Sequence, residues 1–265
     1  MDFTYSVAGL FVGIIVGLTG VGGGSLMTPL LMLLFGVSPA VAVGTDLLYA
    51  SITKAGGAAV HGYRKSVDWR VVGWMGLGSI PASIATLTYL SYRPRSPTSG
   101  DSIFTLALGI MLLVTAVSLV YRKPLQAWFA KRAGNADVPA GVPVKAQKPA
   151  ITVLVGALLG FAVSLTSVGA GAVGVTALLL LYPLMKTSRV IGTDIAHAVP
   201  LTLVAGLGHA SLGNVDWGLL ASLLVGSLPG VALGSMLTSR LPEVVIRNIL
   251  VSLLLVVGGR LVWLR

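Results

Sequence analysis

The chain has 265 residues, of which 55% are hydrophobic and 10% are charged, and its mean hydropathy is +0.93. Soluble domains carry roughly 25% charged residues, so this composition excludes a water-soluble globular protein and predicts an integral membrane protein. The net charge of +10 does not indicate nucleic-acid binding, because the basic residues cluster in loops between apolar segments, and the absence of cysteine excludes disulfides and thiolate metal sites.

The first predicted element covers residues 6–35 and is interrupted by glycine. No charged residue occurs from Phe3 to Thr45, so the segment is predicted to lie at membrane depth. Four of the five residues from Gly20 to Gly24 are glycine, which disfavours a regular helix. Non-helical backbone persists in a membrane only where it is buried in protein or lines a cavity, and broken helices there often form binding sites.

The remaining elements of the first half alternate apolar spans with polar loops. A helix is predicted from about 41 to 60, after the turn at Ser38-Pro39, and a basic loop covers 61–68. Asp68 is a favourable N-cap for the next span, and Trp69 suits the membrane interface. That span extends to about 90, a loop covers 91–101, and another span covers 102–121.

The second half repeats the order of the first. Residues 164–171 align with 17–24 at an offset of 147, and Gly192-Thr193-Asp194 aligns with Gly44-Thr45-Asp46 at an offset of 148. The second offset also relates His61 to His209, the two Val-Asp-Trp motifs, and the Gly-Ser-x-Pro motifs at 78–81 and 226–229. We predict a first membrane repeat over 1–121, a basic cytoplasmic linker over 122–149 and a second repeat over 150–265. The elements of the second repeat are a broken segment at 151–184 and spans at about 190–208, 217–238 and 244–264.

The distribution of Lys and Arg distinguishes two topologies. If each broken segment crossed the membrane once, the halves would be parallel and four basic residues of the second half would lie outside. If each broken segment enters and leaves on one side, the halves are inverted and these residues lie inside, as the positive-inside rule favours. The four are Lys186, Arg189, Arg240 and Arg247. We therefore predict an all-α polytopic membrane protein of two inverted repeats, each with a re-entrant or discontinuous segment and three transmembrane helices.

Two acidic residues, Asp46 and Asp194, are predicted inside spans, where a carboxylate is costly and is a functional candidate. Each has a polar neighbour three residues later on the same helical face. Two roles remain open, namely bracing of the glycine break through backbone N–H groups and proton relay or substrate contact. The candidate residues for proton coupling or bracing are Asp46, Asp194, Tyr49, His197, Thr45 and Thr193.

We favour structural roles for the other ionisable residues in or near the spans. Lys54 is a lone cation in a predicted span; it could attract an anion, but we expect its ammonium group to extend to the interface. His61 and His209 lie where spans meet loops, and we favour structural roles for both. Residues 169–174 spell G-x-G-x-x-G, but they lie in an uncharged run, so we reject dinucleotide binding and expect no cofactor or metal.

The order of the motifs resembles the sulfite exporter TauE/SafE family of membrane transporters. The resemblance rests on Leu-Thr-Gly-Val-Gly-Gly-Gly at 18–24, the repeated Gly-Thr-Asp, and the His that precedes Val-Asp-Trp, and it covers nearly the whole chain. It implies a secondary carrier, not an enzyme, for a small anion such as sulfite, an organosulfonate, thiosulfate or a small oxo-acid. It also implies proton coupling and a multi-pass location in the cytoplasmic (inner) membrane. The second half departs in having Ser167 and Ala170 where the first has Gly20 and Gly23.

The physical properties of a broken helix agree with an anionic substrate. A new helix N-terminus presents unpaired N–H groups and a positive dipole end, and glycine lets an anion approach them closely. Two such breaks near the midplane would form an anion site without arginine. The candidate substrate-binding residues are Thr19, Gly20, Gly22, Gly23, Gly24, Ser25, Thr166, Ser167, Gly169 and Gly171.

The expected partners are the small anion and the lipid bilayer, with no nucleic acid, and a homodimer is one arrangement that the sequence leaves open. A passive anion channel is the nearest alternative function. An intramembrane aspartyl protease with Asp46 and Asp194 as its dyad is a more distant one, because no Gly-x-Gly-Asp or Pro-Ala-Leu signature accompanies them.

Overall fold

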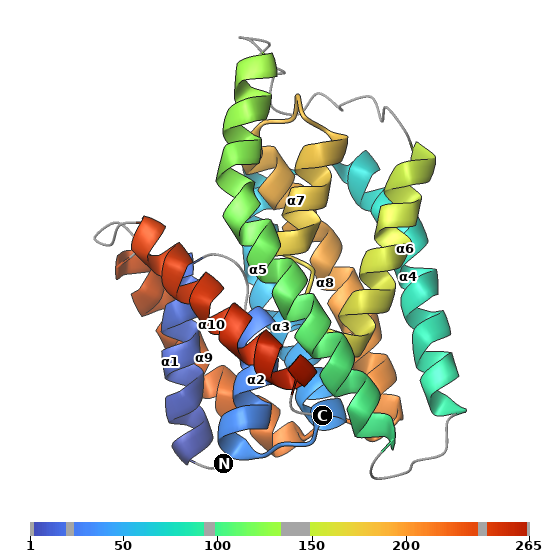
Figure 1. Cartoon of the computed structure of the whole chain (residues 1–265), viewed down its shortest axis with the longest axis vertical. Helices are drawn as coiled ribbons and strands as arrows, with labels where there is room; N and C mark the ends of the chain where they lie inside the picture. The colour runs from blue at the N-terminus through green and yellow to red at the C-terminus, as the bar shows by residue number, and fades with distance from the viewer. Residues whose placement is uncertain (1–2, 20–23, 93–98, 134–148, 238–242, 264–265) are drawn as a thin grey trace.

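The computed structural model describes residues 3–19, 24–92, 99–133, 149–237 and 243–263 (Figure 1). Within these ranges the regular elements are all helices, as predicted. Their bounds are α1 Phe3–Thr19, α2 Gly24–Phe35, α3 Pro39–Tyr63, α4 Trp69–Ser91, α5 Ser99–Ala133, α6 Pro149–Thr166, α7 Ala172–Leu181, α8 Thr187–Ser211, α9 Trp217–Leu237 and α10 Glu243–Trp263.

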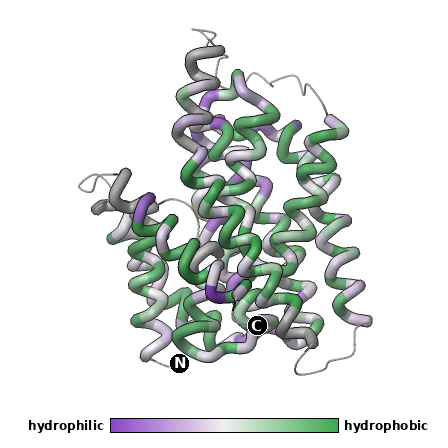
Figure 2. The backbone as a smooth tube through the Cα atoms, viewed as in Figure 1, coloured by the Kyte–Doolittle hydropathy of each residue, from purple (hydrophilic) through white to green (hydrophobic). Residues whose placement is uncertain are grey.

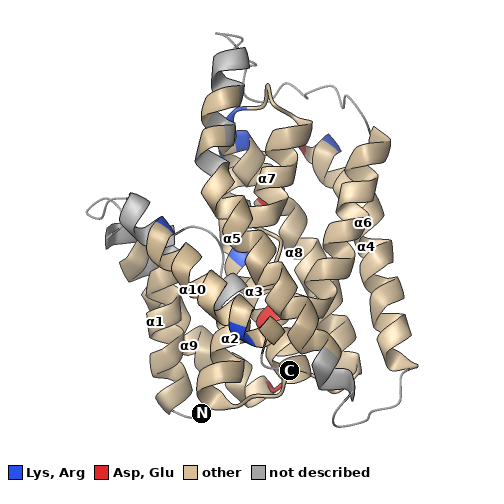
Figure 3. Cartoon of the chain, in the orientation of Figure 1, with Lys and Arg blue, Asp and Glu red and all other residues tan. Residues whose placement is uncertain are grey.

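Several helices have the length and composition of membrane spans. Four described segments are long and apolar enough to cross a membrane: Trp69–Ser91, Ile103–Tyr121, Pro149–Thr166 and Thr187–Ser211. Apolar residues continue along most of each helix (Figure 2), and charged residues are sparse among the described helices (Figure 3). The prediction of a polytopic all-helical membrane protein is confirmed at this level.

Both predicted discontinuities are present. In the first half α1 ends at Thr19 and α2 begins at Gly24, and the four residues between them lie outside the described part of the chain. In the second half α6 ends at Thr166 and α7 begins at Ala172, so the break covers residues 167–171. Glycine occurs at or near both breaks. It disfavours helix because it loses more backbone entropy than other residues when it becomes helical.

The predicted linker begins inside a helix. Helix α5 continues through Ala133, although the sequence predicted solvated linker from residue 122. Its last turns are rich in Leu, Gln, Ala, Lys and Arg, all of which favour helix. The basic composition therefore indicated the end of the apolar span, which lies at Tyr121, but not the end of the helix.

Equivalent helices of the two halves make equivalent contacts, and the most extensive of these contacts join one half to the other. Helix α1 packs against α9 of the second half, and its repeat equivalent α6 packs against α4 of the first. The equivalent helices α3 and α8 face each other, as do α5 and α10. The core is therefore formed between the halves rather than within each one.

Glycines allow the backbones of α1 and α9, and those of α4 and α6, to approach each other closely. A side chain at Gly9 or Gly13 of α1 would collide with the backbone of α9, and one at Gly226 or Gly230 of α9 would collide with α1. The equivalent contact between α4 and α6 uses the glycines Gly78, Gly156 and Gly160 in the same way. At these positions the helix backbones approach closely because no Cβ intervenes.

The two halves run in opposite directions in Figure 1. Helix α1 begins at the lower side of the view and α2 returns to that side, whereas α6 begins at the upper side and α7 returns there. Helix α5 ascends and α10 descends. The second break lies in the interior of the protein, because Ser167, Gly169 and Ala170 are buried.

Candidate functional site

The break between α6 and α7 has a backbone conformation that needs glycine. The φ angles are +124° at Gly169 and +139° at Gly171, both in a region that L side chains rarely adopt. Ser167, which stands where the first half has glycine, also has a positive φ of 57°. An L-residue in the left-handed region carries strain of roughly 1–2 kcal/mol, so the surrounding structure holds Ser167 in place.

The backbone N–H groups of the break are its most distinctive polar feature. The carbonyl oxygen of Gly169 accepts from Gly174 N at 2.9 Å, and that of Gly171 accepts from Val175 N at 3.0 Å. Within the described chain, the N–H groups of Gly169, Ala170 and Gly171 donate no hydrogen bond. Unpaired N–H groups are costly at membrane depth, and together with the N-terminus of α7 they provide donors that suit an anion.

Lys54 of α3 reaches this break from the other half of the protein. Its Nζ donates to the carbonyl oxygen of Ala170 at 2.7 Å, and it lies within electrostatic range of Asp46 and Asp194. The prediction that Lys54 extends to the interface was therefore wrong. An ammonium group with a carbonyl acceptor and two carboxylates nearby is stabilised inside the protein and need not reach water.

Asp46 contacts both broken segments. Its side chain is fully buried, and Oδ2 accepts from the hydroxyl of Thr28, on α2 just after the first break, at 2.6 Å. It also lies next to the Thr28 backbone N–H and to the hydroxyl of Ser167 in the second break. Neither Asp46 Oδ1 nor Ser167 Oγ makes a hydrogen bond of standard geometry within the described chain. The contact with Thr28 supports the bracing role, and Ser167 brings the second break next to the same carboxylate.

Asp194 has the equivalent place in the second half. It is 1% exposed, and its Oδ1 lies so close to Gly174 of α7 that a Cβ there would collide with it. Gly174 is the last glycine of the G-x-G-x-x-G sequence, so this spacing serves carboxylate packing rather than nucleotide binding. Each acid therefore contacts the helix that follows the break of its own half.

The polar neighbours of the two acids reach across to the opposite half. The ring of His197 places Nε2 2.8 Å from the hydroxyl oxygen of Ser79 on α4. At the repeat-related positions Tyr49 lies next to Ser227 on α9, although no hydrogen bond of standard geometry joins them. Sequence reasoning did not select the two serines as site residues. The repeated Gly-Ser-x-Pro motif was the signal that could have identified them.

Thr45 and Thr193 lie farther from the breaks and hold loops of the opposite half. The hydroxyl oxygen of Thr45 accepts from Asp216 N at 3.1 Å, and that of Thr193 accepts from Asp68 N at 2.9 Å. The glycines that precede the two threonines contact the same two loops. In each Gly-Thr-Asp motif the first two residues thus position a loop, and only the aspartate faces a broken segment.

The histidines at the ends of spans also make structural contacts. His61 Nδ1 lies 2.8 Å from the hydroxyl oxygen of Ser66, and His209 Nε2 lies 2.8 Å from the carbonyl oxygen of Ser164. The hydroxyl of Thr166 donates to the carbonyl oxygen of Ala162 at 2.7 Å. The predicted structural roles of the histidines agree with these contacts, and the Thr166 hydroxyl is used within the chain.

An ion pair joins the N-terminus of α4 to α8, and it has no counterpart at the repeat-related positions. Asp68 caps α4 as predicted, because Oδ1 accepts from Arg70 N at 3.1 Å. Its Oδ2 lies 3.2 Å from Nη2 of Arg189, and the two residues are 1% and 6% exposed. Arg189 has Val41 at its repeat position, so comparison of the halves could not have predicted this pair.

The first break, at 20–23, lies outside the described residues. Gly20, Gly22 and Gly23 lie outside the described residues, as do the side chains of Thr19 and Ser25 and the surroundings of Gly24. Their assignment to the substrate site stays a prediction. Among the described residues, no group of three or more His, Cys, Asp or Glu side chains is placed to hold a metal ion.

Comparisons with known proteins identify the family of the chain. The chain matches the family described as Sulfite exporter TauE/SafE over residues 5–261. It is 41% identical over 262 residues to the "Probable membrane transporter protein YjnA" of Bacillus subtilis, covering 99% of this chain and 100% of the relative. It is 25% identical to the B. subtilis "Probable membrane transporter protein YunE", covering 97% and 96%, and 28% identical to a "Probable membrane transporter protein" of Xylella fastidiosa, covering 85% and 80%. No solved structure matches. The chain is thus a multi-pass membrane transporter that belongs to the sulfite exporter TauE/SafE family.

Proposed function

We propose that this transporter is a secondary carrier for a small oxyanion, of the class of sulfite, organosulfonates and thiosulfate, and that it couples anion movement to protons. The observation that carries the proposal is the environment of the second break. Backbone N–H groups that have no partner among the described residues and the Lys54 ammonium group lie there, near two buried carboxylates. The family name supports the sulfur oxyanion class.

The charges of this site supply a reason for proton coupling. Lys54 contributes one positive charge, and Asp46 and Asp194 contribute two negative charges when ionised. An anion that binds beside Lys54 would add a further negative charge in a region of low dielectric, where like charges repel strongly. Protonation of one aspartate removes this repulsion. Anion and proton would therefore be bound together.

We further propose that the halves are inverted repeats and that each broken segment is re-entrant. The basic loops support this arrangement, because it places 61–68 and 182–186 on one side of the membrane. The opposite chain directions of the two halves in Figure 1 also support it. Each break would then lie near the midplane, where both sides of the membrane can be given access in turn.

Transport by purified protein in liposomes tests the proposal. We expect saturable counterflow of labelled sulfite, which an excess of unlabelled sulfite or sulfonate on the opposite side accelerates. An imposed pH gradient should drive net uptake. Flux without counterflow or saturation would instead establish the passive channel. The absence of any sulfur oxyanion flux, with flux of another class of solute, would contradict the proposed substrate.

A further inference from the structure

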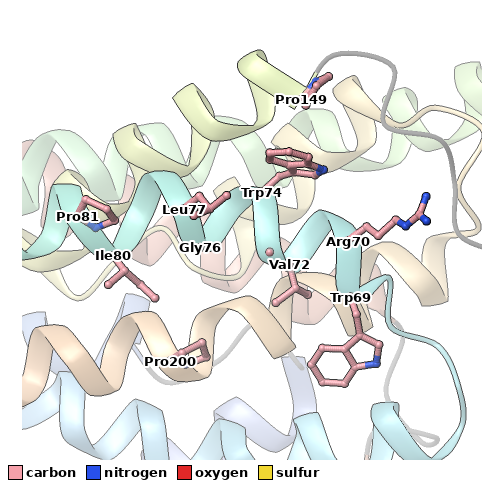
Figure 4. A pocket seen from close by; sticks show the side chains of 11 residues that line it. Trp69, Arg70, Val72, Trp74, Gly76, Leu77, Ile80, Pro81, Pro149 and Pro200 are labelled. Carbon is pink, nitrogen blue, oxygen red and sulfur yellow. The ribbon is translucent and has the colours of Figure 1, made fainter.

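A surface cavity lies on the outer face of α4, away from the breaks. It is a groove of about 910 Å³, which is within the usual range of small-ligand sites. Most of its lining comes from α4, and Pro149 of α6 and Pro200 of α8 complete it (Figure 4). None of its lining residues lies in the break at 167–171 or is a candidate substrate-binding residue, so its role is separate from the substrate site.

Two glycines on this face of α4, Gly73 and Gly76, leave space because they have no side chain. A Cβ at Gly73 would meet no atom within 4 Å, and one at Gly76 would meet only Ile80 Cδ1 at 4.0 Å. Gly78, on the same helix, differs because a Cβ there would collide with the backbone of α6. Gly73 and Gly76 therefore do not serve helix packing. Their missing side chains leave open space on the surface that faces the bilayer.

The residues that form the hollow of α4 are not repeated in α9. At an offset of 148, α9 has Ala221 and Leu224 in place of the two glycines, and Gly218 in place of Arg70. The second half thus has larger side chains where α4 is hollow and lacks the positive charge. Since the repeat preserves many structural positions, this difference indicates a function that needs only one copy.

The groove has a charged aromatic end and an apolar body. Arg70 is the charged lining residue, and Trp69 and Trp74 lie near it, 65% and 38% exposed (Figure 4). From there the apolar residues Leu77 and Ile80 continue along α4. Tryptophan favours the depth of the lipid headgroups, and arginine binds phosphate through charge-assisted hydrogen bonds.

We propose that this groove binds an anionic phospholipid of the bilayer, with its phosphate at Arg70 and an acyl chain along the hollow at Gly73 and Gly76. Charge complementarity selects the headgroup, because the exposed Arg64 and Lys65 precede α4 and add positive potential at the same end of the helix. A zwitterionic lipid would gain the apolar contacts without this attraction.

Lipid titration of the purified full chain in detergent tests the proposal. Phosphatidylglycerol and phosphatidylcholine with identical acyl chains are compared by native mass spectrometry and by the shift in Tm. We expect saturable binding that is tighter for phosphatidylglycerol. Arg70→Gln should weaken phosphatidylglycerol binding about fivefold, which corresponds to one interfacial charge. Gly73→Leu should remove saturable binding of both lipids, because its side chain fills the groove.

Two matched controls separate a built site from general attraction. Gly259→Leu adds the same side chain at a glycine of α10 that also has no atom within 4 Å of a Cβ, and it should leave binding unchanged. Arg64→Gln removes an exposed charge that does not line the groove and should have less effect than Arg70→Gln. Equal loss from both arginine variants would overturn the proposal, and so would unchanged phosphatidylglycerol binding in Arg70→Gln.

A second copy of the chain is the other occupant to be tested. Conversion of a dimer to a monomer by Gly73→Leu, with no lipid dependence in the parent protein, would also overturn the proposal. Should Gly73→Leu fail to fold, the comparison of Arg70→Gln with Arg64→Gln still decides the question.

Discussion

The Nζ atom of Lys54 lies 2.7 Å from the carbonyl oxygen of Ala170, a residue 116 positions away in the sequence. This contact joins α3 of the first half to the broken segment of the second. Because Lys54 is also within electrostatic range of Asp46 and Asp194, one cation connects the break with both buried acids. An anion at the break would compete with a neutral carbonyl oxygen for this ammonium group, and a charged acceptor binds it more strongly.

Lys54→Met should weaken substrate binding. A hydrogen bond to a charged group contributes roughly 1.5–3 kcal/mol, so we expect about a tenfold to a hundredfold loss of sulfite affinity, measured by binding titration. Lys54→Arg, which keeps the charge, should retain part of the affinity. Lys65→Met is the control, because Lys65 is exposed in the turn that follows α3. Wild-type affinity in a folded Lys54→Met protein would exclude direct contact between Lys54 and the anion.

Replacement of either buried acid should remove the proton dependence of transport. Asp46→Asn and Asp194→Asn keep the size of the side chain but cannot exchange a proton, so uptake driven by a pH gradient should be lost. Asp216→Asn is the matched control, since Asp216 lies at the N-terminus of α9, where its Oδ1 accepts from Leu219 N at 2.9 Å. If transport by both buried-site variants still followed the pH gradient, neither acid would carry the coupled proton.

Asp68→Asn should destabilise the protein more than Asp216→Asn. Both residues cap a helix, and loss of a cap costs about 1 kcal/mol. Of the two, only Asp68 forms an ion pair within the described chain, which it makes with Arg189. Removing one partner of a buried ion pair costs roughly 3–5 kcal/mol. Thermal unfolding in detergent measures the difference, and the double variant Asp68→Asn/Arg189→Gln should recover part of the lost stability. Equal Tm values for Asp68→Asn and Asp216→Asn would show that the pair contributes nothing.

Gly169→Ala and Gly171→Ala should reduce both stability and sulfite affinity. Each adds roughly 1–2 kcal/mol of backbone strain at a positive φ, and each places a methyl group beside the backbone N–H groups of the break. Gly56→Ala is the control, because a Cβ at Gly56 of α3 meets no atom within 4 Å. The same changes at Gly22 and Gly24 should have similar effects if both breaks contact the anion. Unchanged affinity in all the folded break variants would place the site elsewhere.

Cysteine accessibility in intact cells tests the topology, and the chain has no native cysteine to interfere. Cysteines at Lys65 and Thr187 should be protected from an impermeant thiol reagent, because inverted repeats place both loops inside. A cysteine at Ser38, which is exposed in the turn between α2 and α3, should be labelled. Labelling at Thr187 together with protection at Lys65 would instead indicate eight simple crossings with parallel halves.

Much of the helix architecture was predictable because its causes are local. Uncharged apolar runs indicated the spans, and clustered glycine indicated the discontinuities that begin after Thr19 and Thr166. The end of α5 was not predictable from the same information, because helix propensity continues beyond the apolar span. Part of the site was also visible in sequence, since Asp46 and Asp194 are acids in apolar spans and recur at a fixed offset.

The sequence by itself determined a membrane-embedded repeat, its two glycine breaks and the pair of buried acids, because hydropathy, glycine content and repeat spacing are encoded in neighbouring residues. Only the tertiary structure decided which helices meet, since α1 packs on α9 and α6 on α4 across the repeat boundary. It also decided that Lys54 turns inward to Ala170 and that Arg189 pairs with Asp68. The direction of a long charged side chain depends on acceptors that distant segments bring near it, and no local pattern specifies those.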